Sequence, residues 1–216
     1  MNKNLKKRII TSVLLLLLMT AMFLKNEMLM LILLLGCIFS FIEFSRMIKI
    51  INQNKKITQL IYNLVFIFYL FLFSAFFVIT SFYLNLKIII FSILIICICS
   101  DMGGIIFGKY FKGPKLIKIS PNKTISGSIG SFFLAIIASI ILFYYLTDKF
   151  DISFIFIGVG ISLAVQAGDL IFSYLKRKSK LKDTGNILPG HGGILDRVDG
   201  ILLGLPIGFI FIIFIL

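Results

Sequence analysis

The segment TQLIYNLVFIFYLFLFSAFFVITSFY, residues 58–83, contains no charged side chain and decides the class of fold. An apolar helix of about 20 residues spans the ~30 Å hydrocarbon layer of a bilayer, so this run is long enough to cross a membrane with a tilt or a break. The other apolar runs cover residues 9–24, 28–44, 88–107, 125–147, 152–172 and 200–216. The sequence therefore predicts an all-α, polytopic integral membrane protein with about seven transmembrane helices, of which the first and last are short.

The composition supports a membrane protein over a soluble one. Of the 216 residues, 59% are hydrophobic, and the mean hydropathy is +1.08. One globular core of this size cannot bury so much apolar surface, so the excess is expected to face lipid. The net charge of +13 would suggest a nucleic-acid partner in a soluble protein, but in a membrane protein the positions of the charges matter more than their sum. We expect no nucleic-acid partner.

The basic residues alternate between the two sides of the predicted membrane. With the N-terminus in the cytosol, every Lys and Arg except Lys25, Lys87 and Lys149 falls on the cytosolic side. This bias fits the positive-inside rule with seven spans. A secretory signal peptide is the alternative for the first apolar run, but no small-x-small cleavage site follows it.

The long polar segments, residues 108–124 and 173–199, are predicted to be loops on the same, cytosolic face. We divide the chain into N-terminal transmembrane helices, residues 1–90, and a region that carries the chemistry, residues 91–216. The three cysteines fall inside apolar runs without metal-ligand spacing, so they are expected to be small core residues.

Two carboxylates lie near the predicted cytosolic ends of apolar runs. Asp101, in CICSDMGGIIFGK, lies about six residues, or roughly 9 Å, inside its run. An ionisable residue at that depth is a functional candidate, although a hydrogen bond between helices is the alternative. Asp169, in VQAGDLIFSYLKR, shares a predicted helix face with Gln166, Ser173 and Lys176. A simple Asp169–Ser173 hydrogen bond is the alternative there.

The stretch LPGHGGILDRVDG, residues 188–200, concentrates polar groups. Asp196 and Asp199 can cap the last helix. Two carboxylates beside a lysine-rich loop also suggest Mg²⁺ holding phosphate oxygens. The only histidine, His191, is a candidate hydrogen-bond donor or acid, although a lone loop histidine is often incidental.

Glycines and basic residues in the same segment suit an anionic ligand. Gly190, Gly192 and Gly193 permit positive φ and a close backbone approach to an anion. Phosphate is expected to be bound by the basic side chains of the segment, namely Lys176, Arg177, Lys182 and Arg197. A second anion site is predicted in SPNKTISGS, residues 120–128, where Lys123, Thr124, Ser126 and Gly127 precede an apolar helix.

The run from Ser173 to Asp199 follows the pattern S-x-L-K-R-x4-K-D-x-G-x2-L-P-x-H-G-G-I-x-D-R-V-D. This pattern resembles the signature of the phosphatidate cytidylyltransferases, also called CDP-diacylglycerol synthases. The resemblance extends to QAGDLIFS, SPNKTISG and the D-x-x-G that begins at Asp101, and so covers roughly residues 97–200.

The resemblance implies transfer of a cytidylyl group from CTP to phosphatidate, giving CDP-diacylglycerol and pyrophosphate in phospholipid biosynthesis. The expected enzyme is a Mg²⁺-dependent nucleotidyltransferase, multi-pass in the cell inner (plasma) membrane, with its active site at the cytosolic face. Its expected partners are CTP, phosphatidate and the lipid bilayer, with a second cation and a homodimer left open.

Site roles follow from the same resemblance. Catalytic roles are assigned to Asp169, Asp196, Lys176, Arg197 and His191. Metal binding is assigned to Asp169 and Asp196, with Asp199 and Asp101 in support. Substrate binding is assigned to Ser173, Arg177, Lys182, Asp183, Gly192, Gly193, Lys123, Thr124 and Ser120.

Two rival functions remain open at this point. A CTP-dependent polyprenol or lipid kinase would release CDP in place of pyrophosphate, and would need a base for its alcohol substrate. A non-enzymatic anion transporter would use the same basic pocket, but the repeat halves typical of transporters are absent from the sequence.

Overall fold

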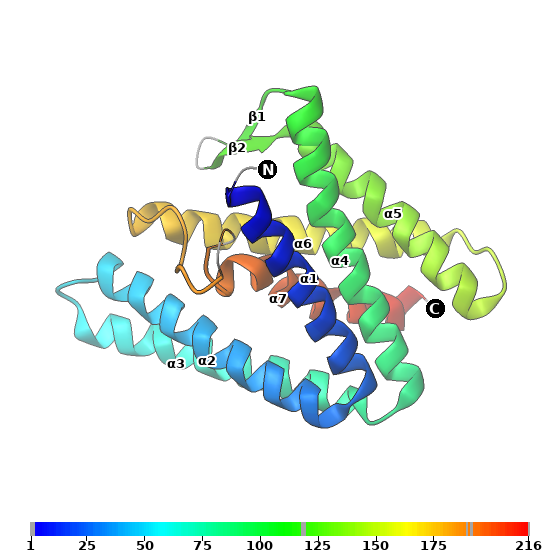
Figure 1. The fold of residues 1–216 in the computed structure, drawn as a ribbon, viewed down its shortest axis with the longest axis horizontal. Coiled ribbons are helices and arrows are strands. Elements are labelled where there is room, and N and C mark those ends of the chain that lie inside the picture. The colour runs from blue at the N-terminus through cyan, green and yellow to red at the C-terminus, as the bar shows by residue number, and fades with distance from the viewer. Residues whose placement is uncertain (1–2, 118–119, 189, 191, 216) are drawn as a thin grey trace. The chain divides into compact units, whose positions relative to one another are not determined.

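The computed structural model describes residues 3–117, 120–188, 190 and 192–215. Figure 1 shows a chain dominated by long helices. The elements are α1 (Lys3–Leu24), α2 (Asn26–Ile51), α3 (Lys56–Ser81), α4 (Leu84–Phe111), β1 (Lys115–Ile117), β2 (Ser120–Thr124), α5 (Ile125–Thr147), α6 (Ser153–Lys178) and α7 (Leu195–Ile215). The all-α prediction is confirmed, apart from one short hairpin of strands.

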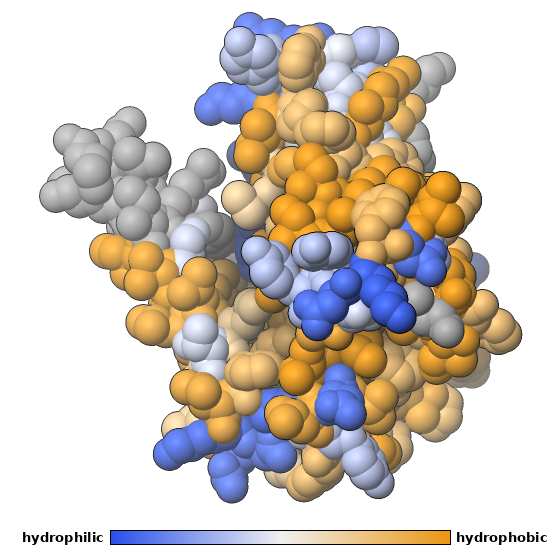
Figure 2. Space-filling model, turned by 90° about the vertical axis from the view of Figure 1, so that its right-hand side faces the viewer, coloured by the Kyte–Doolittle hydropathy of each residue, from blue (hydrophilic) through white to orange (hydrophobic). Residues whose placement is uncertain are grey.

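Six of these helices, α2 to α7, are long and apolar enough to cross a membrane by length and composition. In α1 the apolar part is shorter and covers Ile10–Leu24. The run at 58–83, which was long enough to break, forms the single helix α3. Large apolar side chains remain exposed along α3, among them Phe68 at 62% and Phe71 at 64%. Hydrophobic residues likewise cover much of the face shown in Figure 2. A surface of this kind is stable against lipid, so the chain is an all-α membrane protein.

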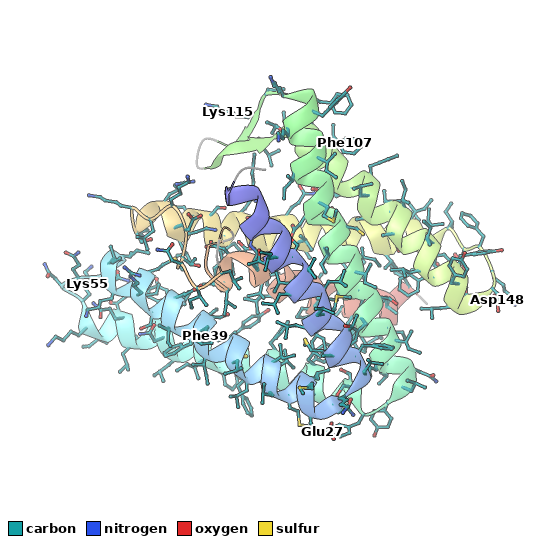
Figure 3. All side chains as sticks on the ribbon, in the orientation of Figure 1. Glu27, Phe39, Lys55, Phe107, Lys115 and Asp148 are labelled. Carbon is teal, nitrogen blue, oxygen red and sulfur yellow. The ribbon has the colours of Figure 1, made fainter. Side chains whose placement is uncertain are left out.

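The chain divides into two compact units. The first unit contains residues 1–87 and 175–198. In it, α2 packs against both α1 and α3, and the rings of Phe44 and Phe66 stack with centroids 3.9 Å apart. In Figure 3, Glu27 marks the start of α2 and Lys55 marks the connection between α2 and α3. At the Glu27 end, the Lys87 ammonium donates to the Asn26 side chain at 2.7 Å, which satisfies a buried charge.

The second unit contains residues 88–174 and 199–216. Glycines allow its helices to approach closely, as is common between membrane helices. A Cβ added to Gly103 of α4 would overlap the Gly130 carbonyl of α5, and one added to Gly168 of α6 would lie 2.6 Å from the Asp199 carbonyl of α7. The helix α7 contains Pro206, which membrane helices tolerate because neighbouring groups satisfy the freed carbonyl.

Both predicted loops are shorter than the sequence suggested. The helix α4 continues to Phe111, and β1 and β2 then form an antiparallel hairpin with Lys115 opposite Thr124. Such short strands leave no periodic signal in the sequence. The helix α6 continues through its basic residues to Lys178, and α7 begins at Leu195, so the second loop is confined to the residues between them.

Side-chain caps define two helix starts in the second unit. The Thr124 hydroxyl accepts the Gly127 N–H at 3.1 Å at the start of α5, as an N-cap residue does. Asp151 accepts the Ser153 N–H at 2.8 Å at the start of α6. The backbone hydrogen bond from Ser153 lowers the pKa of the Asp151 carboxyl.

Candidate active site

The loop between α6 and α7 is organised around the carboxylate of Asp196, in the first turn of α7. Its Oδ1 accepts from the Lys176 ammonium at 2.7 Å. Its Oδ2 accepts the backbone N–H groups of Thr184 at 2.8 Å and Gly193 at 3.0 Å, and lies 3.0 Å from the Thr184 hydroxyl. The sequence predicted a Mg²⁺ ligand at Asp196; in this structure its oxygens are largely engaged by donors of the chain itself, and its role as a metal ligand stays a prediction.

A second carboxylate, from Glu43 of α2, lies against the same loop. It accepts the Thr184 hydroxyl at 2.7 Å and the N–H groups of Ile194 at 3.1 Å and Leu195 at 2.9 Å. Sequence reasoning missed Glu43 because the first 90 residues carry no recognisable motif. The available signal was an acid inside an apolar run, the same signal that identified Asp101.

The glycines of this loop have two distinct functions. Gly190 and Gly192 adopt positive φ, at 79° and 86°, as predicted. Gly193 is required for space, because a Cβ there would overlap the Thr184 hydroxyl and the Glu43 carboxylate. Its N–H donates to Asp196, so in this structure that amide stabilises the loop.

The remaining predicted groups of the loop are mostly on its surface. Arg177, Lys182, Asp183 and Arg197 are exposed, and Lys176 is half-buried. His191 lies outside the described residues, so its predicted role stays a prediction.

In the second unit, Asp169 of α6 forms an ion pair with Lys123 of β2. Ser173 contributes a long contact to the same carboxylate, with its hydroxyl 3.5 Å from Oδ1. The structure thus joins two segments that sequence analysis proposed separately, the end of α6 and the segment that precedes α5. Thr124 serves as the N-cap of α5. The side chain of Ser120 is not among those that the structure describes, so its predicted role in substrate binding stays a prediction.

A line of neutral polar side chains continues from Asp169 along α6. Ser128 donates to Gln166 at 2.5 Å, Gln166 donates to Ser162 at 3.1 Å, and the hydroxyls of Ser162 and Ser100 are 2.9 Å apart. Lys176 of the predicted polar face pairs with Asp196 of α7 instead, whereas the chain of hydrogen bonds through Gln166 and Ser162 is directed from α6 at α5 and α4. It satisfies polar groups that would otherwise be costly among apolar helices.

Asp101 and Asp199 are associated with the close crossings of the second unit. Asp199 is buried, with 6% of its surface exposed, and it accepts the Gly200 N–H at 2.9 Å. A Cβ added to Gly200 would lie 3.6 Å from the Asp101 carboxylate. Within the described part of the chain, no group of three or more His, Cys, Asp or Glu side chains is arranged to hold a metal ion. Asp169 and Asp196 belong to different units, and their sharing of one ion stays a prediction.

The long apolar helices, with acid–lysine ion pairs in the segments that connect them, define a helical membrane protein. The chain belongs to the cytidylyltransferase family, whose model matches residues 44–215.

Two curated proteins are similar in sequence to this chain. A phosphatidate cytidylyltransferase of Rickettsia typhi is 43% identical over 117 residues, which are 50% of this chain and 51% of the relative. The protein of the same name from Staphylococcus aureus is 41% identical over 126 residues, 57% of this chain and 48% of the relative. The chain spans about half the length of the curated relatives it matches.

Proposed function

We propose that this protein transfers a cytidylyl group from CTP to phosphatidate, forming CDP-diacylglycerol and pyrophosphate. Membership of the cytidylyltransferase family and the names of its relatives support this reaction. The observation that carries the proposal is the hydrogen-bonded assembly of Lys176, Thr184, Gly193 and Asp196, because it fixes the segment in which the signature residues lie.

The chain supplies charge where two polyanions have to meet. Phosphatidate carries an ionised phosphate at neutral pH, so it needs no general base to attack the α-phosphorus of CTP. The main task is to bind and align negative groups. The exposed Arg177, Lys182 and Arg197 are assigned to the triphosphate and the lipid phosphate. Lys123 and Lys176 are already paired with carboxylates, and a bound phosphate would compete for them.

The donor set also fits a Mg²⁺ ion. Mg²⁺ prefers hard oxygen ligands and usually takes one or two carboxylates from the protein. Among the described residues, Oδ1 of Asp169 has only the 3.5 Å contact to Ser173, so Asp169 is the first candidate ligand. Asp196, Asp199 and Asp101 are the further candidates. When bound, the ion would neutralise phosphate charge.

The topology we propose places the reaction at the cytosolic face of the inner membrane. The N-terminus and both basic segments lie in the cytosol in this topology, with α1 as a seventh span. The distribution of Lys and Arg supports it. Acyl chains of the lipid would remain in the bilayer while the headgroup reaches the loop. A homodimer and a second cation are compatible with this scheme.

The test is turnover by purified protein in detergent, with CTP labelled separately at the α- and γ-phosphates and with phosphatidate and Mg²⁺ supplied. The expected products are α-labelled CDP-diacylglycerol and γ-labelled pyrophosphate. Release of CDP with γ-label in a lipid alcohol would refute the proposal in favour of a lipid kinase. The absence of any turnover with intact binding of CTP would also refute it.

A further inference from the structure

Glu43 is a buried acid in an apolar helix. It lies within the run LILLLGCIFSFIEF, residues 31–44, and only 3% of its surface is exposed. Burial of a carboxylate among apolar groups is costly unless hydrogen bonds compensate it. A buried charge is also weak evidence for a stabilising role, because apolar replacements of similar volume are often at least as stable. The placement of Glu43 therefore calls for a role beyond stability.

All three hydrogen bonds that the structure gives to Glu43 come from one short segment far along the chain. The donors, Thr184, Ile194 and Leu195, follow it by 141, 151 and 152 residues. The last two supply backbone N–H groups at the start of α7, which have no partner within the helix. A negative charge is favourable at that end of a helix. Glu43 thus caps α7 from a different helix.

Thr184 connects Glu43 to the signature carboxylate. Its hydroxyl oxygen lies 2.7 Å from Glu43 Oε2 and 3.0 Å from Asp196 Oδ2. A hydroxyl carries one proton, so it donates to one carboxylate at a time, and the shorter contact is to Glu43. The Thr184 N–H donates to Asp196. Thr184 therefore links the carboxylate of Asp196 to that of Glu43 in α2, in addition to the bonds from Ile194 and Leu195.

The backbone of the loop packs closely against the carboxylate of Glu43. A Cβ added to Gly185 or to Gly193 would overlap the Glu43 side chain. The backbone on both arms of the loop therefore lies directly against Glu43, and small residues at these positions make that approach feasible.

We infer that Glu43 is a positioning residue for the cytidylyl transfer proposed above, on which this inference rests. It holds residues 184–195 against α2 and, through Thr184, sets the carboxylate of Asp196. It acts through these residues and does not contact substrate. Glu43 precedes by one residue the region that the family model matches, residues 44–215.

The experiment compares Glu43→Gln with wild-type protein in detergent. Glutamine has nearly the same shape but loses the charge and turns an NH₂ group toward a donor. Glu27→Gln is the matched control, because Glu27 is an exposed acid on the same helix. Hydrogen exchange is measured for the peptide that contains Ile194 and Leu195, and KM for CTP is measured in parallel.

In Glu43→Gln, we expect exchange of these amides to rise about tenfold or more, as loss of a hydrogen bond to a charged group implies. Peptides from α4 and α5 should exchange as in wild type. We also expect KM for CTP to rise. A smaller folded fraction lowers only the apparent kcat, so a raised KM distinguishes positioning from a purely structural role.

Wild-type exchange at Ile194 and Leu195 in Glu43→Gln would overturn the inference, as would an unchanged KM. If the Gln variant does not elute as folded protein, Glu43→Asp replaces it under the same criteria, because it keeps the charge but withdraws the carboxylate by one methylene. The hydrogen-exchange measurement does not depend on turnover. If the wild-type protein lacks the proposed activity, the proposed reaction is refuted. Faster exchange at Ile194 and Leu195 in the variant would still support the hydrogen bonds by which Glu43 positions the loop.

Discussion

The substitution Asp196→Asn tests the assembly on which the proposed function depends. Asparagine keeps one acceptor oxygen. Placed at the Oδ2 position, that oxygen preserves the bonds from Thr184 and Gly193, but the NH₂ group then faces the Lys176 ammonium, which lies 2.7 Å from Oδ1 in the native pair. The opposite orientation sets the NH₂ group against the donors of Thr184 and Gly193. Either orientation removes the ion pair.

The magnitude follows from the burial of this pair. The side chains of Lys176 and Asp196 are 13% and 6% exposed, so solvent screens their interaction only partly. A hydrogen bond to a charged group contributes about 1.5–3 kcal/mol, and loss of one partner of a well-buried pair costs about 3–5 kcal/mol. We therefore expect about 3 kcal/mol of lost loop stability. The proposed function needs the loop in this arrangement in the transition state, and about 3 kcal/mol lost there corresponds to a fall in kcat/KM of about 100-fold or more, at a factor of ten per 1.36 kcal/mol.

The assay is initial-rate turnover of labelled CTP with phosphatidate, alongside size-exclusion elution and circular dichroism to check folding. Asp148→Asn is the matched control. Asp148 is exposed and adopts φ of 54°, a conformation that asparagine tolerates, so this variant should retain wild-type turnover. Near-normal kcat/KM in folded Asp196→Asn protein would refute the assignment of Asp196 to the site.

Three further predictions concern the two units and the topology. Asp169→Asn should need a higher Mg²⁺ concentration for half-maximal turnover or be inactive, and a Mg²⁺ titration identical to wild type would count against Asp169 as a ligand. Gly193→Ala should lose most turnover because the added Cβ would overlap the Thr184 hydroxyl. Gly36→Ala is the control and should remain active, because nothing lies within 4 Å of an added Cβ there. Equal turnover by the two variants would contradict the described packing of the loop. A cysteine at exposed Lys115, introduced after replacement of the native cysteines, should react with an impermeant maleimide only in inverted membrane vesicles, and labelling of intact spheroplasts would overturn the proposed topology.

The helices were predictable because the membrane imposes a simple rule on sequence. A spanning helix needs a long apolar run, and each predicted run coincides with a helix of the structure. The helix ends were less predictable. The helix α2 continues past its apolar run through Arg46 and Lys49 to Ile51, because straight-chain basic residues are good helix formers. Hydropathy predicts the part of a helix that lies in lipid, but the helix itself can continue beyond that part.

Asp169 and Asp196 were recognisable from sequence, but their partners and the buried acid Glu43 were not. Asp169 and Asp196 stand out because acids are scarce in this chain. The partner of Asp169 is Lys123, on a strand that residue patterns did not reveal. Glu43 lies outside any recognisable motif, and its donors, 141 to 152 residues away, gave no local signal either. Local spacing predicts which residues share a helix face, but it does not contain the contacts made between distant segments.

The pairing of charges within each unit has a physical cause. Near apolar helices the effective dielectric constant is low, and an isolated charge is costly there. Asp196 pairs with Lys176 inside the first unit, and Asp169 pairs with Lys123 inside the second. Each of these acids is therefore compensated by its own unit before any substrate binds. In the proposed reaction, a polyanionic substrate would compete with the carboxylates for the same lysines, so the pairs that stabilise the fold would also keep the proposed phosphate-binding groups in place.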